Sequence, residues 1–69
     1  MIINGEEKDF EIGITIENLL KKLNIDAERI VIEVDLEIIS KDEFKTKRLG
    51  SESKVELIRF VGGGWFIFS

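Results

Sequence analysis

The sequence predicts a small α+β domain in which one helix packs on a mixed sheet of four to five strands. One stretch, residues 15–25, spaces its apolar residues as a helix does, whereas residues 54–61 alternate apolar and polar as a strand does. The chain has 69 residues, of which 43% are hydrophobic and 35% charged. That size and composition predict one folded, charged domain with a small core.

Residues 1–12 predict a β-hairpin with its turn over residues 4–7. The turn contains Asn-Gly, a strong hairpin signal because both residue types tolerate positive φ. Apolar residues alternate on each predicted strand: Met1 and Ile3 on the first, Phe10 and Ile12 on the second.

Residues 13–25 predict the helix. Thr15 is the expected N-cap, Glu17 suits the positive end of the helix dipole, and Asn24 is expected to end the helix. Apolar residues at i, i+3, i+4 and i+7 form one stripe for the core: Ile16, Leu19, Leu20 and Leu23.

Residues 29–36 predict a strand of good quality. Apolar residues alternate along it: Ile30, Ile32, Val34 and Leu36. A short strand is expected over residues 37–40, followed by a helical turn capped by Ser40. A turn at residues 49–53 then leads into the last strand, residues 54–61.

The composition excludes several kinds of chemistry. The chain has no His and no Cys, so it has no His- or Cys-based nucleophile, no zinc site of those ligands and no disulfide. Its net charge of −4 disfavours binding to nucleic acid. No apolar run could span a membrane, and the first residues do not resemble a signal peptide. We therefore expect a cytoplasmic protein that is not an enzyme and binds no metal, nucleic acid or membrane.

Four segments have a distinctive order and spacing: "INGEE" at 3–7, "TIENLLKKLNI" at 15–25, "RIVIEVDLEIISKDEF" at 29–44 and "VELIRFVGGG" at 55–64. Together they resemble the ThiS family of sulfur carriers in thiamine thiazole synthesis. The resemblance implies the β-grasp (ubiquitin-like) fold. The sequence departs from the family pattern at two points. Asp35-Leu36 stands where many relatives have Asn-Gly, and the glycines are not terminal.

The resemblance also implies a mechanism in which Gly64, preceded by Gly62 and Gly63, carries the sulfur. A ThiF-like adenylating enzyme, using ATP and Mg²⁺, activates the glycine carboxylate, which then becomes a thiocarboxylate. Thiazole synthase (ThiG-like) accepts the sulfur. The carrier itself needs no cofactor, and glycines suit a thin end that enters a narrow channel.

The last strand carries the predicted docking residues. Val55 and Leu57 are expected to face the helix and the core. Ile58, Phe60 and Val61 are candidates for binding the adenylating enzyme, although they could equally cover a partly buried sheet face.

Residues 65–69 follow the glycines and are mostly large and apolar. We divide the chain into a β-grasp domain, residues 1–61, and a flexible Gly-rich tail with an apolar extension, residues 62–69. The extension could be removed by a processing protease, be retained in a protein that carries no sulfur, or form a hairpin with the last strand. The hairpin is disfavoured because a central strand should be paired on both edges. The precursor interpretation is favoured, and a retained tail predicts a monomer or weak dimer.

Two other functions stay open from the sequence. The small subunit of molybdopterin synthase resembles this chain in its fold, its chemistry and its Gly-Gly end. A ubiquitin-like module that binds proteins without sulfur transfer would have the same fold.

Overall fold

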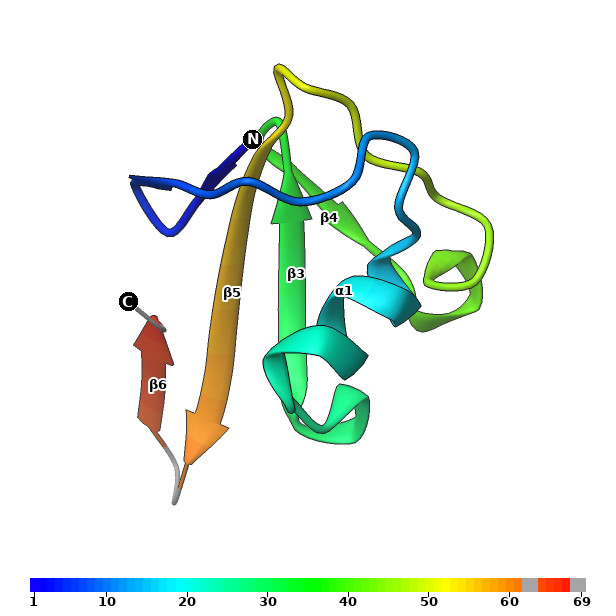
Figure 1. Ribbon diagram of the computed structural model, residues 1–69. Coiled ribbons are helices and arrows are strands. Elements are labelled where there is room, and N and C mark those ends of the chain that lie inside the picture. Colours follow the sequence, from blue (N-terminus) through cyan, green and yellow to red (C-terminus); the bar gives the residue numbers. More distant parts are fainter. Residues whose placement is uncertain (62–63, 68–69) are drawn as a thin grey trace.

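The structure, a computed structural model, describes residues 1–61 and 64–67, with side chains up to residue 59. This part of the chain holds one α-helix, two 3₁₀ turns and six strands (Figure 1). Their bounds in chain order are β1 Ile2–Ile3, β2 Glu6–Glu7, α1 Ile16–Leu23, η1 Ala27–Arg29, β3 Ile30–Val34, β4 Glu37–Ile39, η2 Lys41–Glu43, β5 Lys54–Val61 and β6 Gly64–Ile67.

The sheet has β5 at its centre. Its strand order is β2-β1-β5-β3-β4, and β6 pairs with β5 outside this path. β1 runs parallel to β5, and the other paired strands are antiparallel. The predicted mixed sheet is therefore confirmed. β1, β3, β4 and β5 correspond to predicted strands, β2 lies in the segment predicted as a turn, and β6 is an additional strand.

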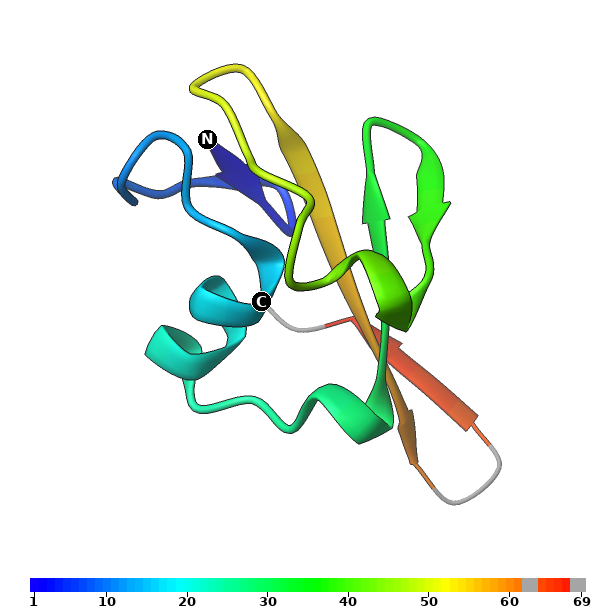
Figure 2. The ribbon, with the colours of Figure 1, turned by 90° about the vertical axis from the view of Figure 1, so that its right-hand side faces the viewer.

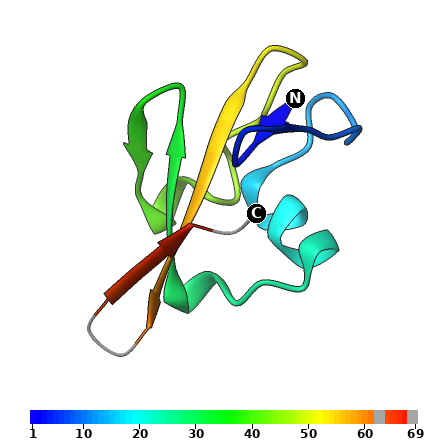
Figure 3. The same cartoon turned by 90° about the vertical axis from the view of Figure 1, so that its left-hand side faces the viewer.

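The core lies between the sheet and α1. Figures 2 and 3 show α1 on one side of the sheet. Alternate residues of β3 and β5 face that side because side chains alternate along a strand. Those on the other side are only partly buried or exposed. The buried apolar residues are Met1, Ile3, Ile14, Ile16, Leu19, Leu20, Ile30, Ile32, Val34, Ile39, Phe44, Leu49, Val55 and Leu57.

Both ends of α1 are capped as predicted. Thr15 Oγ1 accepts a hydrogen bond from the Asn18 amide at 3.2 Å. Asn24 has φ 62°, and its amide donates to the carbonyls of Leu20 and Lys21. Asparagine tolerates this left-handed conformation, which ends the helix after Leu23.

The first hairpin is shorter than predicted. Its turn is Asn4-Gly5 alone, with φ 51° and 82°, and β2 ends at Glu7. The predicted strand with Phe10 and Ile12 is wrong: Phe10 packs partly against the core and Ile12 is 70% exposed. The chain leaves the sheet after Lys8 to reach α1, so the alternation there belongs to a connecting segment.

β3 ends two residues before the sequence predicted. The strand stops at Val34, and Asp35-Leu36 forms a turn with φ 50° and 71°. Leu36 is 90% exposed, so the prediction that it continues the inward alternation is wrong. Asp35 ties the turn to β5, because its Oδ1 accepts from the Lys54 amide at 3.1 Å and its amide donates to the Lys54 carbonyl at 2.8 Å.

The predicted helical turn after Ser40 is present as η2, and Ser40 occupies its N-cap position as predicted. Ser40 makes no side-chain cap to the backbone, and its hydroxyl donates instead to Glu43 Oε1 at 3.2 Å. The segment from η2 to β5 closes the core with Phe44 and Leu49.

Candidate functional site

The glycine segment, residues 62–64, follows the central strand β5 in the sequence, and its last residue begins β6. β5 ends at Val61, and Gly64 begins β6 directly opposite it. Gly62 and Gly63, predicted to belong to the site, lie outside the described residues. Gly64–Ile67, within the predicted tail of residues 62–69, is a strand, while the predicted division into a domain and a flexible tail stays a prediction.

β5 has room for β6 because β1 is short. β1 pairs with β5 at Lys54 and Val55, and β6 pairs with it from Ile58 to Val61. The expectation that both edges of the last strand are already paired is therefore wrong. A strand of two residues leaves most of one edge of β5 available.

Asn4 forms hydrogen bonds with β5 on this edge, between the residues that pair with β1 and those that pair with β6. Its amide donates to the Val55 carbonyl at 2.9 Å, which continues the β1 ladder by one bond. Its side-chain Oδ1 accepts from the Leu57 amide at 2.8 Å, so a side chain replaces the next backbone partner. Asn4 thus pairs with the Val55 carbonyl and the Leu57 amide, between the residues of β5 that pair with β1 and those that pair with β6.

The structure describes the predicted docking residues to different extents. Ile58 lies on β5 opposite Val31, on the face that α1 does not cover, and both are half-buried. Phe60 and Val61 belong to β5, but their side chains lie outside the described residues. Their role in binding a partner stays a prediction. The predicted inward direction of Val55 and Leu57 is confirmed, since both are 1% exposed.

An open hollow of about 390 Å³ lies between the end of α1 and the strands β1 and β5. Its floor is apolar, and Lys8, Asp26 and Arg59 are among its charged residues. The hollow forms between segments far apart in the chain, so sequence patterns gave no signal for it. Its lining residues include no serine or threonine.

The described residues contain no group of three or more carboxylates that could hold a metal ion. No helix among them is long and apolar enough to cross a membrane. The glycine segment after β5 stays the candidate site that the sequence predicts.

Several known proteins are similar to this chain in sequence or in fold. A model of the ThiS family matches residues 1–64. Thiazole synthase of Paramagnetospirillum magneticum is 36% identical over 64 residues, covering 93% of this chain and 20% of that protein. Thiazole synthase of Magnetococcus marinus is 31% identical over 62 residues, covering 90% and 19%. The chain therefore spans about a fifth of the length of these relatives.

Two shorter proteins match over most of their length. The protein ycf40 of Porphyra purpurea is 34% identical over 62 residues, covering 90% of this chain and 87% of that one. The crystal structure of the thiamine biosynthesis protein ThiS from Geobacter metallireducens superposes with a TM-score of 0.76 at 26% identity, covering 91% and 96%.

The fold and the glycine segment after its central strand define a ubiquitin-like domain of the β-grasp class. The predicted fold is thereby confirmed. The chain belongs to the ThiS family, as the resemblance of its four segments implied.

Proposed function

We propose that this protein is a sulfur carrier for formation of the thiazole of thiamine. Gly64 is the carrying residue, and the sulfur travels as a thiocarboxylate on its main-chain carbonyl carbon. Family membership supports this role, as does the similarity to two proteins named thiazole synthase. The carrier is not itself an enzyme and is acted on by partners.

The observation that carries the proposal is the point where the family match ends. It covers residues 1–64 and stops at the glycine that the mechanism requires. In this chain Gly64 is joined to Trp65 by a peptide bond. A carrier needs a free carboxylate there, so hydrolysis of this bond by a processing protease is part of the proposal.

The proposed steps need no reactive side chain from the carrier. One carboxylate oxygen of Gly64 attacks the α-phosphate of ATP on a ThiF-like enzyme that holds Mg²⁺, and pyrophosphate leaves. A sulfur nucleophile then attacks the acyl carbon, and AMP leaves. A ThiG-like thiazole synthase receives the sulfur. This division of labour fits a chain with no His and no Cys.

The pairing of β6 with β5 affects the proposed cleavage of the Gly64–Trp65 bond. The Gly64–Trp65 bond lies in a strand that pairs with Val61 and Phe60 of β5. A segment of four residues held by one edge contributes little stability by itself. We therefore expect β6 to separate from β5 before the bond is cut and before Gly64 enters the active site of an adenylating enzyme.

The first test is the intact mass of the protein isolated from its own organism. A species that ends at Gly64, heavier by the exchange of one oxygen for one sulfur, is expected. If every molecule retains residues 65–69, Gly64 does not carry sulfur.

A reconstitution separates processing from activation. Every core side chain that the structure describes lies between Met1 and Leu57, so a chain ending at Gly64 keeps its core. With the adenylating enzyme and Mg-ATP, this chain should release pyrophosphate and the full chain should not. The same chain with Gly64 removed is the matched control and should be inactive. Equal pyrophosphate release from the full chain would contradict the requirement for processing.

The pairing of β6 with β5 favours a second candidate, a protein-binding module that keeps its extension. In that case the hairpin is part of the mature protein. The intact-mass measurement distinguishes the two functions, because only the carrier loses residues 65–69.

A further inference from the structure

Four residues form a surface that the carrier mechanism does not use. We call Glu33, Leu36, Ile38 and Glu56 the distal patch. Glu33 and Glu56 lie on neighbouring strands on the sheet face opposite α1, and Ile38 pairs with Glu33 from β4. Leu36 lies in the turn that joins β3 to β4. This end of the sheet is opposite the end at which β5 stops (Figure 1).

The apolar part of the patch is strongly exposed. Leu36 is 90% and Ile38 71% exposed. Leu36 also has φ 71°, a conformation that glycine adopts freely and that is unfavourable for a bulky residue. A large apolar side chain is therefore presented to solvent at a conformational cost, which the fold does not require.

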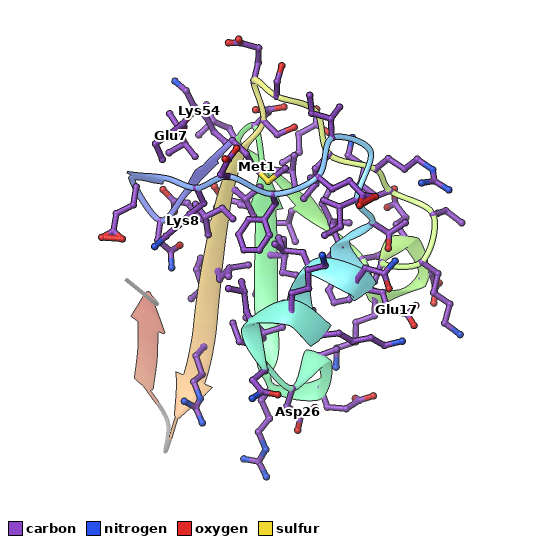
Figure 4. All side chains as sticks on the ribbon, viewed as in Figure 1. Met1, Glu7, Lys8, Glu17, Asp26 and Lys54 are labelled. Carbon is purple, nitrogen blue, oxygen red and sulfur yellow. The ribbon has the colours of Figure 1, made fainter. Side chains whose placement is uncertain are left out.

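The acidic part of the patch is also unfavourable in the isolated molecule. Glu33 and Glu56 are directly paired across β3 and β5, and like charges in that position repel. Among the described residues, neither takes part in a salt bridge. Lys54 lies two residues before Glu56 on β5, on the same face of the sheet. It pairs across the strands with Ile2, which in turn pairs with Glu7 (Figure 4).

One kind of partner would offset both costs. We infer that the distal patch binds a protein surface in which an Arg or Lys side chain stands among apolar residues. The cation would lie between Glu33 and Glu56, and the apolar side chains would cover Leu36 and Ile38. Because the patch is far from Gly64 along β5, a partner could hold it while the glycine is in an active site.

The inference rests on the proposed function only for the choice of partners to test. These are the thiazole synthase and the adenylating enzyme of the same organism, each purified and titrated with the full chain by calorimetry. The first variant is Leu36→Gly and the second is the double variant Glu33→Gln and Glu56→Gln. Neither endangers folding, since one relieves an unfavourable φ and the other removes repulsion.

The expected result separates binding from structure. Both variants should unfold at higher urea concentration than the natural chain and yet bind at least one partner about tenfold more weakly. The double variant should also lose most of the salt dependence of binding. The matched control, Glu11→Gln with Ile12→Ser, removes one exposed acid and one exposed isoleucine outside the sheet and should bind normally.

Unchanged affinity of both variants for both partners would overturn the inference, as would failure of the natural chain to bind either partner. Failure of the carrier function is a separate result. If the variants bind weakly but no thiocarboxylate forms on a chain ending at Gly64, the patch stands and the proposed function falls.

Discussion

Two tight turns in this molecule share a backbone geometry but differ in sequence. Asn4 and Gly5 have φ 51° and 82° between β1 and β2, and Asp35 and Leu36 have φ 50° and 71° between β3 and β4. The first turn uses the residue types that favour positive φ at both positions. The second has a favourable residue at the first position and a leucine at the second. The strands that each turn joins therefore impose its backbone geometry. The residue types determine only how much conformational free energy that geometry costs.

The two turns also hold β5 in different ways. In the first, Asn4 Oδ1 accepts from the Leu57 amide, a partly buried hydrogen bond in the middle of the central strand. In the second, Asp35 Oδ1 accepts from the Lys54 amide at its exposed start. The first turn is therefore the more important one for stability.

The largest expected effect breaks the first turn. Asn4→Ala removes the acceptor for the Leu57 amide, and it places at positive φ a residue whose side chain can form no local hydrogen bond. We expect a loss of about 2–3 kcal/mol in the free energy of unfolding, measured by urea denaturation. Asn4→Asp keeps an oxygen in place and should lose less. Equal losses for the two variants would show that the hydrogen bond contributes nothing.

Gly5→Leu makes the first turn resemble the second. A Cβ at Gly5 would meet no atom within 4 Å, so the effect is conformational. We expect a loss of about 1–2 kcal/mol in the same measurement. Gly50→Ala is the matched control, because Gly50 does not have positive φ and its Cβ would lie 3.9 Å from Ser53 Oγ. A comparable loss in the control would contradict the explanation by φ.

Leu36→Gly makes the second turn resemble the first. It should raise the free energy of unfolding by about 1 kcal/mol, the relief of positive φ less the entropy cost of glycine. Ile38→Gly, two residues further on in β4 and outside the positive-φ residues, should instead destabilise the protein. Destabilisation by Leu36→Gly would mean that Leu36 stabilises the isolated chain.

Asp35→Asn should have the smallest effect. Asparagine tolerates positive φ and retains an oxygen that can accept from the Lys54 amide. A change of no more than about 0.5 kcal/mol is expected by urea denaturation. A much larger loss would show that the charge of Asp35, rather than its hydrogen bond, holds the turn to β5.

Sequence predicts those elements of the fold whose signals are local. α1 could be predicted because its cap residues and apolar stripe act within the helix itself. β5 could be predicted with its bounds, since its first half alternates apolar and polar residues and its run of strand-forming residues ends at the glycines. Phe10 and Leu36 misled the prediction because an apolar residue in a connection or a turn carries the same pattern as one in a strand.

The site depends more on non-local features. The position of Gly64 follows from the resemblance, because a glycine run alone indicates no particular function. The pairing of β6 with β5 could not be predicted, since it depends on the length of β1, a strand distant in sequence. The distal patch likewise depends on the register between β3 and β5, which places Glu33 opposite Glu56.

The parallel pairing of β1 with β5 has a consequence for the order of folding. Ile3 pairs with Val55, so the first strand has no place in the sheet until the start of the last long strand is available. A contact between such distant segments closes a long loop and forms slowly compared with local structure. On the ribosome, β3, β4 and α1 can begin to form while β1 still lacks its partner β5. The sheet is completed only after β5 has left the exit tunnel.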